Sequence, residues 1–228
     1  LETKGDDAIG SDEIWETATD APRNALETEG LTYEVESGEA AFYGPKIGVN
    51  AIDALDRSWT IGTVQVDFNI PERLDLAYVG EDNAEHRPVA IHRALLGSFE
   101  RFMAVLIEHF KGNFPTWLAP EQVRVLPISD DQLAYAESVA ADVREAGFRV
   151  EVEDRDMTVG RKIRAGHDDR VPYMLIVGSD EADAETVSVR DRQEREINDV
   201  EPSVFLDHLR TERDQKSENP YFVPMQKH

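Results

Sequence analysis

Two side chains with cationic chemistry, His92 and Arg101, stand nine residues apart around an apolar stretch, a glycine turn and an expected helix start. Histidine is a common metal ligand, and a guanidinium binds phosphates and carboxylates. Gly97 and Ser98 suit a turn and a helix N-cap, which puts Arg101 in the first turn of a helix over 99–110. A cation there opposes the helix dipole, so an anion beside it is favoured. A surface arginine paired with a neighbouring glutamate also explains the position.

Two further segments carry polar side chains that suit a site. One loop holds Tyr43, a glycine-proline turn and Lys46, directly before an expected strand. A lysine so placed can meet a phosphate or a carboxylate, and a solvated lysine in a turn is the simpler interpretation. In the strand 59–68, alternation with period two puts Gln65 and Asp67 on one face. That face is either exposed to solvent or the floor of a cleft, and periodicity is compatible with both.

His92 taken alone is ambiguous. A single histidine in an apolar strand is more often a hydrogen-bonded core residue than a metal ligand. A catalytic zinc site needs at least three protein ligands, and the other histidines show no supporting spacing. If His92 binds a metal, its co-ligands must come from outside these 228 residues.

The composition is strongly acidic, with 24 Lys and Arg against 47 Asp and Glu, a net charge of -23 and no cysteine. Such a surface repels nucleic acids at low ionic strength, but close cationic contacts survive at molar salt, where the Debye length is about 3 Å. We interpret the acidity as an adaptation to a salty cytoplasm. The absence of cysteine excludes disulfides and thiolate metal sites within the chain and favours the cytosol. No apolar run approaches the roughly 20 residues that span a bilayer, so no membrane partner is expected.

The hydrophobic pattern predicts an α/β protein of the α+β kind, with two domains. Successive strands over 33–95 with short turns predict an antiparallel sheet, flanked by a helix over 11–29 and a helix over 99–110 that packs on it. After a segment with Gly and Pro at 111–120, strands and helices alternate, which predicts a small domain with a mainly parallel sheet. The expected strands are 33–35, 47–51, 59–68, 74–79, 88–95, 123–128, 148–152, 173–177 and 187–190, and the later helices are 130–146, 159–168 and 202–213. We place the domains at 1–115 and 116–228, with a loose tail from Asp214.

The second domain contains no catalytic constellation, but it holds two clusters of cations. One cluster spans residues 155–170 and the other spans residues 190–195. In so acidic a chain these clusters are candidate anion-binding surfaces. Pairing with the many nearby Asp and Glu residues explains them equally well.

Several segments, in this order, resemble threonyl-tRNA synthetases. They are AAFYGPKI (40–47), WTIGTVQVDF (59–68), RPVAIHRALLGSFERF (87–102) and WLAP (117–120), followed by matches in 154–164, 171–175 and 187–190. The resemblance extends from about residue 11 to residue 209. It implies that residues 1–115 are the later part of a class II synthetase catalytic domain, and that the remainder is an anticodon-binding domain.

The resemblance also implies roles for the polar residues above. Arg101 matches the arginine of class II motif three, which binds a phosphate of ATP (with Mg²⁺), and Gly97 and Ser98 belong to the same motif. His92 matches one of three zinc ligands. In the family, zinc holds the amino and hydroxyl groups of threonine, and valine is rejected because it lacks the hydroxyl group. The positions lining the threonine and adenylate pocket are Tyr43, Lys46 and Gln65. Thr60 and Ile61 depart from the usual Gln-Cys, which puts an adenosine contact in doubt.

In the second domain the resemblance implies that Arg170, Glu181 and Arg190 read the tRNA anticodon. Arginine suits a guanine edge, and glutamate accepts from an exocyclic amine. Asp156 stands where the family usually has asparagine, which weakens any contact carried over to that position.

These matches predict a threonine–tRNA ligase whose partners are L-threonine, ATP and tRNA-Thr, with a homodimer in the full-length enzyme. The family's motifs one and two and its other two zinc ligands are absent from the chain, so we expect a fragment that is inactive alone. A non-catalytic tRNA-binding accessory protein is the alternative. A synthetase for proline, histidine or glycine is a third interpretation, which the metal-position histidine disfavours.

Overall fold

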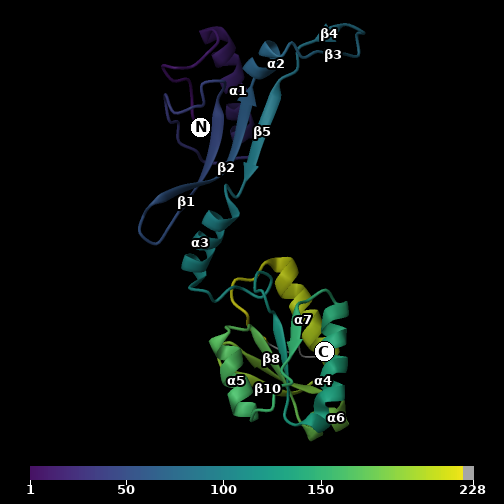
Figure 1. The fold of residues 1–228 in the computed structure, drawn as a ribbon. Helices are drawn as coiled ribbons and strands as arrows, with labels where there is room; N and C mark the ends of the chain where they lie inside the picture. The colour runs from purple at the N-terminus through teal and green to yellow at the C-terminus, as the bar shows by residue number, and fades with distance from the viewer. Residues whose placement is uncertain (223–228) are drawn as a thin grey trace. The chain divides into compact units, whose positions relative to one another are not determined.

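The structure is a computed structural model, and it describes residues 1–222. The chain divides into two compact units, Leu1–His109 and Phe110–His228, which are described separately (Figure 1). Within residues 1–222, no helix combines the length and the apolar character needed to cross a membrane.

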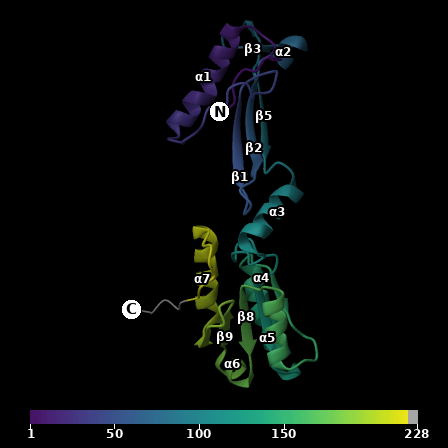
Figure 2. The same cartoon turned by 90° about the vertical axis from the view of Figure 1, so that its left-hand side faces the viewer.

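The first unit is built on a three-stranded antiparallel sheet in the order β1-β2-β5 (Figure 2). The strands are β1 (Lys46–Ile52), β2 (Ser58–Asp67) and β5 (Ala90–Leu95). Helix α1 (Asp12–Thr28) begins where the Ser11 hydroxyl accepts a hydrogen bond from the Ile14 N–H, and it continues through Pro22. It buries Trp15 and Leu26, as its amphipathic pattern predicts.

Two expectations for this unit are wrong. The strand expected over 74–79 is reduced to β3 (Tyr78–Val79), which pairs with β4 (Glu85–His86) after the short helix α2 (Asn69–Arg73). The stretch 33–35 forms no strand. The apolar residues of these segments are spread over turns, and Leu74, Leu76 and Val79 are exposed. Hydrophobicity alone therefore predicted more strand residues in this unit than the structure has.

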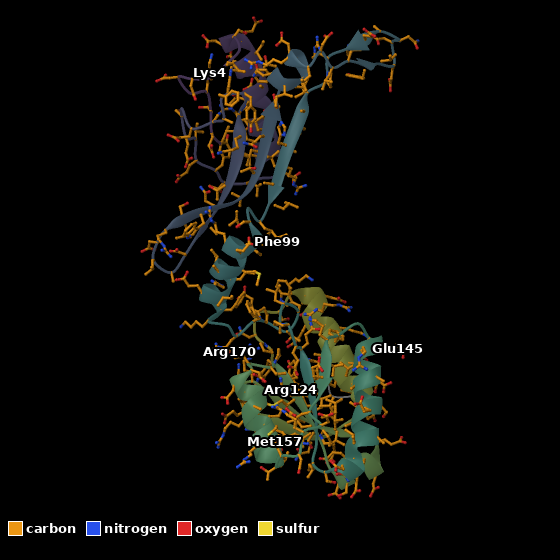
Figure 3. The ribbon with its side chains drawn as sticks, viewed as in Figure 1. Lys4, Phe99, Arg124, Glu145, Met157 and Arg170 are labelled. Atoms are coloured by element: carbon orange, nitrogen blue, oxygen red, sulfur yellow. The ribbon has the colours of Figure 1, made fainter. Side chains whose placement is uncertain are left out.

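Helix α3 (Phe99–Phe110) has the predicted bounds, but none of its residues is buried. Phe99, labelled in Figure 3, is 74% exposed. The expectation that this helix packs on the sheet is therefore wrong for the described chain. Residues 1–222 therefore leave the apolar side of α3 at least partly exposed.

The second unit is a five-stranded sheet in the order β10-β9-β8-β6-β7. Strands β7, β6 and β8 are parallel, β9 pairs with β8 in antiparallel fashion, and β10 pairs with β9 in antiparallel fashion. The elements are β6 (Val123–Pro127), η1 (Asp130–Gln132), α4 (Leu133–Glu145), β7 (Val150–Val152), α5 (Val159–Asp168), β8 (Tyr173–Val177), α6 (Ser179–Ala184), β9 (Val187–Asp191), β10 (Glu196–Val200) and α7 (Pro202–Gln215). The alternation after residue 120 predicted this α/β arrangement, whereas α6 and β10 were missed.

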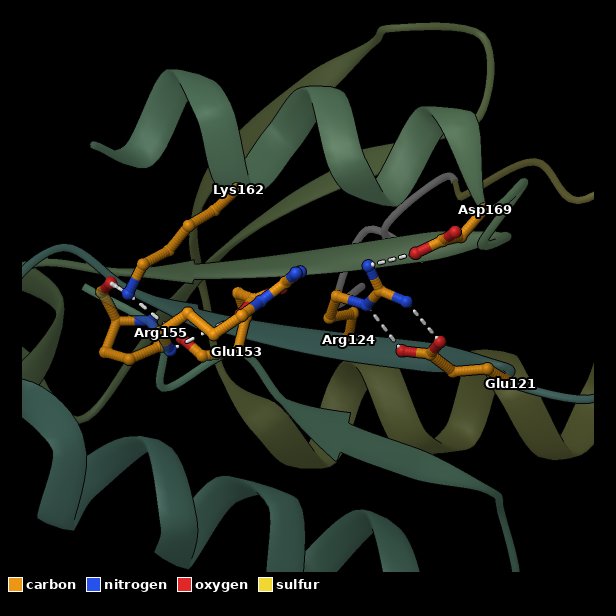
Figure 4. A network of polar contacts seen from close by, with 7 residues as sticks. Glu121, Arg124, Glu153, Arg155, Lys162 and Asp169 are labelled. Atoms are coloured by element: carbon orange, nitrogen blue, oxygen red, sulfur yellow. Dashed lines mark hydrogen bonds and ion pairs between the residues drawn. The ribbon is translucent and has the colours of Figure 1, made fainter. Parts of the chain in front are cut away.

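Helices cover both faces of this sheet, with α5 on one side and α4 and α7 on the other (Figure 1). Phe205 and Leu209 of α7 are fully buried in the larger cluster. Figure 4 shows how α5 is fastened to its face: the buried Lys162 ammonium donates to the carbonyls of Pro127 (3.0 Å) and Glu153 (2.9 Å). At the C-terminal end of α5, Arg124 of β6 pairs with Asp169, the residue that follows the helix.

The loose tail expected from Asp214 is only partly testable. Asp214 and Gln215 belong to α7, and Phe222 is buried in the core of the second unit. Residues 223–228 lie outside the described residues.

Candidate functional site

Three predicted site residues form one row across the sheet of the first unit. Lys46 of β1 is paired with Gln65 of β2, and Gln65 is paired with His92 of β5. Directly opposed residues of neighbouring strands project from the same face, with Cβ atoms about 5 Å apart. The antiparallel register therefore brings together side chains that are up to 46 positions apart in the sequence. This is the polar face for which periodicity was compatible with either solvent exposure or the floor of a cleft.

His92 is oriented by a buried carboxylate. One Asp67 oxygen lies 2.9 Å from His92 Nε2, and its other oxygen accepts the N–H groups of Asn69 and Ile70 at 2.9 Å each. The Asp67 side chain has no solvent exposure, whereas His92 is 45% exposed. The hydrogen bond at Nε2 thus fixes the orientation of the imidazole, and Nδ1 is the nitrogen that remains for a ligand.

Tyr43 completes this cluster from the loop before β1. Its ring meets the His92 ring edge-on with 5.7 Å between centroids, and its carbonyl accepts from the Asn69 amide at 2.8 Å. The next residue, Gly44, lies against β2 so closely that an added Cβ would stand 1.7 Å from the Val66 carbonyl oxygen. Only glycine permits this approach, which seats Tyr43 over the sheet.

Lys46 meets a carboxylate, one of the two partners that its position suggested. Its ammonium pairs with Glu2, and the main chains of the two residues exchange hydrogen bonds of 2.8 and 3.2 Å. Glu2 therefore extends the row by one position. No local sequence pattern predicts this contact, because the two partners are 44 positions apart.

Arg101 lies at the other end of β5, in the first turn of α3. Leu96 and Gly97 both have positive φ (69° and 62°), and a Cβ on Gly97 would stand 3.2 Å from the Thr60 carbonyl oxygen. The Ser98 hydroxyl accepts from the Arg101 N–H at 3.2 Å, the N-cap hydrogen bond that the sequence predicts. The turn thus fixes where α3 starts relative to β2.

The Arg101 guanidinium lies over Trp59 of β2, with 5.0 Å to the ring centroid. The indole N–H donates to Asp53 at 2.8 Å, and Arg57 also pairs with Asp53 at 2.6 Å. Burial raises the pKa of Asp53, but these hydrogen bonds outweigh it and hold the pKa well below its ordinary value. The support of Arg101 by Trp59 was missed in the sequence, because nothing local connects the two residues.

The described residues do not complete a metal site. Among residues 1–222, no group of three or more His, Asp or Glu side chains is placed to hold a metal ion. Asp67 gives His92 the second hydrogen bond that metal-binding histidines usually have. His92 therefore fits a single ligand position.

In the second unit the structure brings together two of the three predicted anticodon residues. Glu181 of α6 accepts from the Ser188 hydroxyl at 2.7 Å, and Ser188 and Arg190 lie two positions apart on one face of β9. Burial raises the pKa of Glu181, but the Ser188 hydroxyl and the Gly178 N–H lower it further than burial raises it. Arg190 pairs with Glu196 at 3.0 Å.

Arg170 lies elsewhere. It precedes β8 by three residues, whereas Glu181 follows the same strand by four. Its guanidinium donates to the Lys111 carbonyl. Strand β8 thus separates Arg170 from Glu181.

Comparison with known proteins agrees with both units. A family model described as "tRNA synthetase class II core domain (G, H, P, S and T)" matches residues 9–110, and one described as "Anticodon binding domain" matches residues 122–212. The threonine–tRNA ligase of Natronomonas pharaonis is 59% identical over 98% of this chain, and that of Haloquadratum walsbyi is 55% identical over 99%. The chain belongs to the threonine–tRNA ligase family of class II tRNA synthetases.

The family match extends to solved structures. The chain resembles the crystal structure titled as the RNA binding domain of threonyl-tRNA synthetase from Cryptosporidium parvum, with a TM-score of 0.81 and 36% identity. That likeness covers 92% of this chain and 53% of the other. The chain spans about a third (35%) of the length of the two curated threonine–tRNA ligases.

Proposed function

We propose that this chain is part of a threonine–tRNA ligase, which activates L-threonine with ATP and transfers it to tRNA-Thr. The observation that carries the proposal is the row Lys46–Gln65–His92, with Tyr43 against His92, in a chain that is 59% identical to such a ligase. Each of these side chains offers polar atoms to the same face of the sheet. A small polar substrate such as threonine suits this face.

In this proposal Arg101 binds a phosphate of ATP, whose charge Mg²⁺ shares. Gly97 and Ser98 set the start of α3, and Trp59 supports the guanidinium from β2. An arginine held by its neighbours loses less rotamer freedom when it binds an anion, which favours phosphate binding.

Tyr43, Lys46 and Gln65 line the threonine and adenylate pocket, and His92 is one zinc ligand. Zinc would supply a Lewis-acid centre for the amino and hydroxyl groups of threonine. A catalytic zinc site takes three protein ligands, so the other two must come from a part of the ligase outside residues 1–222. A homodimer of the complete ligase also belongs to this proposal.

In the second unit Arg170, Glu181 and Arg190 are the proposed anticodon readers, with Arg170 before β8 and Glu181 after it. The pKa of Glu181 is lowered, so at neutral pH its carboxylate is an acceptor for a base amine. Arg190 offers guanidinium donors from the same face. Their pairing with Ser188 and Glu196 limits the directions in which they can meet a base.

The test separates the two units by their readouts. In the complete ligase, we expect His92→Ala to abolish threonine activation and to lower the zinc content, with little change in tRNA binding. The matched control is His86→Ala, because His86 is also 45% exposed and pairs with Asp82 on the β3–β4 hairpin. Threonine-dependent pyrophosphate exchange and bound zinc are measured for both variants. Equal loss of activation and tRNA binding in His92→Ala would mean that His92 is structural.

The complementary variant is Arg190→Gln. Binding is measured in molar KCl with tRNA-Thr and with the same tRNA carrying a changed anticodon. We expect the wild type to prefer the native anticodon, and Arg190→Gln to lose that preference by about 1–3 kcal/mol, the usual value of a base contact. A wild type without preference contradicts the anticodon role.

A further inference from the structure

Glu2 gives the first unit a buried carboxylate beside Lys46, as Asp67 does beside His92. Glu2 lies opposite Lys46 in an antiparallel bridge, and both their main chains and their side chains are paired. Directly opposed residues project from the same face, so the Glu2 carboxylate lies on the face that carries Gln65 and His92. The exposed fraction is 10% for the Glu2 side chain and 20% for that of Lys46, so the pair is largely shielded from water.

The backbone that carries this carboxylate is held from two sides. Lys46 of β1 pairs with Glu2 on one side, with main-chain hydrogen bonds of 2.8 and 3.2 Å. On the other side, the Thr3 N–H donates to the Glu36 carbonyl at 3.0 Å, and the Glu36 N–H donates to the Leu1 carbonyl at 2.9 Å. The Glu2 side chain therefore starts from a fixed position.

A glycine of β1 leaves room for the carboxylate. Gly48 is two positions beyond Lys46 on the same face, and a Cβ added there would stand 2.7 Å from Glu2 Oε1. Gly62 of the neighbouring strand β2 differs, because the nearest atoms to a Cβ there lie at 3.6 Å, an ordinary contact distance. The space above Gly48 is thus occupied by the carboxylate that pairs with Lys46.

The pair has an energetic consequence for Lys46. An ammonium that is taken out of water is costly unless an anion lies beside it, and Glu2 supplies that anion. An ammonium has three N–H donors, so a carboxylate on one side leaves donors for a further acceptor. Without the carboxylate, the flexible lysine side chain samples several rotamers, and substrate binding then has to restrict them.

We propose that Glu2 is a positioning residue of the active site, which holds Lys46 with N–H donors available to an anionic oxygen of the substrate. That oxygen belongs to the carboxylate of threonine or to the phosphate to which the carboxylate is joined on activation. The inference rests on the proposed function, which places Lys46 in the threonine and adenylate pocket. Glu2 acts through Lys46 and does not itself contact the substrate.

The first experiment measures threonine-dependent pyrophosphate exchange in the complete ligase. We expect Glu2→Ala to lower kcat/KM for threonine by about 10-fold, and Glu2→Gln, which keeps an acceptor, to lower it less. In a Lys46→Ala background, Glu2→Ala should cause no further loss, because its effect passes through Lys46. A higher KM for threonine assigns the contact to the threonine carboxylate, and a lower kcat assigns it to the phosphate. Glu36→Ala is the matched control, because its exposed side chain belongs to the segment that holds Glu2.

A second variant moves the carboxylate without removing it. Gly48→Ala introduces a methyl group that displaces Glu2 Oε1, and the displaced atom is the far end of a flexible side chain, so the sheet should still fold. We expect Gly48→Ala to reproduce part of the loss seen in Glu2→Ala, and to have no effect when Glu2 is already alanine. Gly62→Ala, the matched control on β2, should behave as the wild type.

A further arm needs no catalysis and uses the 228-residue chain. Lysines are acylated with a succinimidyl ester, and the rate at each lysine is followed by mass spectrometry. We expect Lys46 to react several-fold faster in Glu2→Ala and Gly48→Ala than in the wild type, with the exposed Lys111 unchanged as the internal control. A complete ligase that does not activate threonine contradicts the proposed function, whereas Glu2-dependent protection of Lys46 still supports the contact on which the inference stands.

Three results would overturn the role of Glu2. They are losses from Glu2→Ala and Lys46→Ala that multiply in the double variant, wild-type kinetics and labelling in Gly48→Ala, and a loss of tRNA binding as large as the loss of activation. The last result would mean that Glu2 only stabilises the fold. If Glu2→Ala does not fold, Glu2→Gln and Gly48→Ala carry the test, since both keep a side chain at position 2.

Discussion

Each unit carries polar side chains in a row across its sheet, but the two rows are held in different ways. In the first unit the row Lys46–Gln65–His92 lies on a face where His92 is 45% exposed, and the buried Asp67 orients that histidine. In the second unit, the row that joins Arg124, Met174 and Arg190 passes beneath α5. A single buried carboxylate therefore orients the histidine of the first site, whereas in the second row Met174 packs against α5 and the two arginines are held by several ion pairs.

The cores differ in the same sense. Almost all of the buried apolar side chains belong to the second unit, while the first unit buries few, among them Trp15 and Leu26. On β5 of the first unit, Ile91 and Leu95 are 69% and 66% exposed. Burial of apolar surface is the main source of folding free energy. The second unit should therefore be the more stable of the two.

The largest expected effect tests this difference in cores. Phe205 is fully buried in the second unit, and Phe99 of α3 is 74% exposed. We expect Phe205→Ala to lower the free energy of unfolding of the second unit by about 3–5 kcal/mol, because it leaves a cavity. Phe99→Ala should change the stability by no more than about 0.5 kcal/mol. Urea unfolding, with hydrogen exchange assigned to each unit, measures both.

A comparable loss in the two variants would contradict the comparison. It would mean that α3 has a packing partner in solution that the described residues do not show. In that case the first unit would be as well packed as the second.

A second, smaller effect concerns a buried carboxylate of the second unit. Glu212 accepts from the Tyr173 hydroxyl at 2.7 Å and from the Tyr221 N–H at 3.0 Å. Burial raises the pKa of Glu212, but its hydrogen bonds, first that from His208, bring the pKa below the ordinary 4.5. Since the folded pKa is below the unfolded one, the stabilisation is present above about pH 4.5 and is lost as the pH falls through the folded value.

We therefore expect Glu212→Gln to cost about 1–2 kcal/mol at pH 7, where charged hydrogen bonds are lost, and progressively less below pH 4.5. Urea unfolding of the second unit over pH 3–7 measures the difference, with the exposed Glu218→Gln as control. A cost that does not vary with pH would show that the charge of Glu212 is not involved. The transition of the first unit should not move.

The same contrast explains how much the sequence predicts. In the second unit, hydrophobic alternation predicted α5 and β8 with their observed bounds, because all residues of β8 are buried and Val159 and Ile163 of α5 are partly buried against that strand. In the first unit, 74–79 was assigned to a strand because it contains apolar residues, and most of these are exposed in turns. Hydrophobic periodicity predicts a helix or strand correctly where the apolar residues are buried, and it is misleading where they are exposed.

The site residues divide along similar lines. Local motifs indicated Tyr43, Lys46, Gln65, His92 and Arg101, and period two placed Gln65 and Asp67 on one face. The contacts that hold them, Asp67 with His92 and Trp59 with Arg101, depend on strand register. Register follows from pairings between distant segments, which a single sequence does not reveal.

The smallest effect compares the two tryptophans that carry a cation. In the first unit Arg101 lies 5.0 Å from the Trp59 ring centroid, and in the second Lys216 lies 5.1 Å from that of Trp117. If Trp59 positions Arg101 for ATP, Trp59→Leu in the complete ligase should raise the KM for ATP about 2- to 5-fold, which corresponds to the loss of roughly 0.5–1 kcal/mol of cation–π energy.

Because Trp59 acts through Arg101, Trp59→Phe, which keeps an aromatic face, should restore most of the affinity for ATP. The KM for threonine should stay unchanged, and Trp117→Leu should leave the KM for ATP as it is in the wild type. ATP-dependent pyrophosphate exchange over a range of ATP concentrations separates KM from kcat. Two outcomes would contradict this role: a Trp59→Leu enzyme with lower kcat at unchanged KM, or one that loses affinity for both substrates alike. Either would show that Trp59 stabilises the sheet as a whole and does not position Arg101.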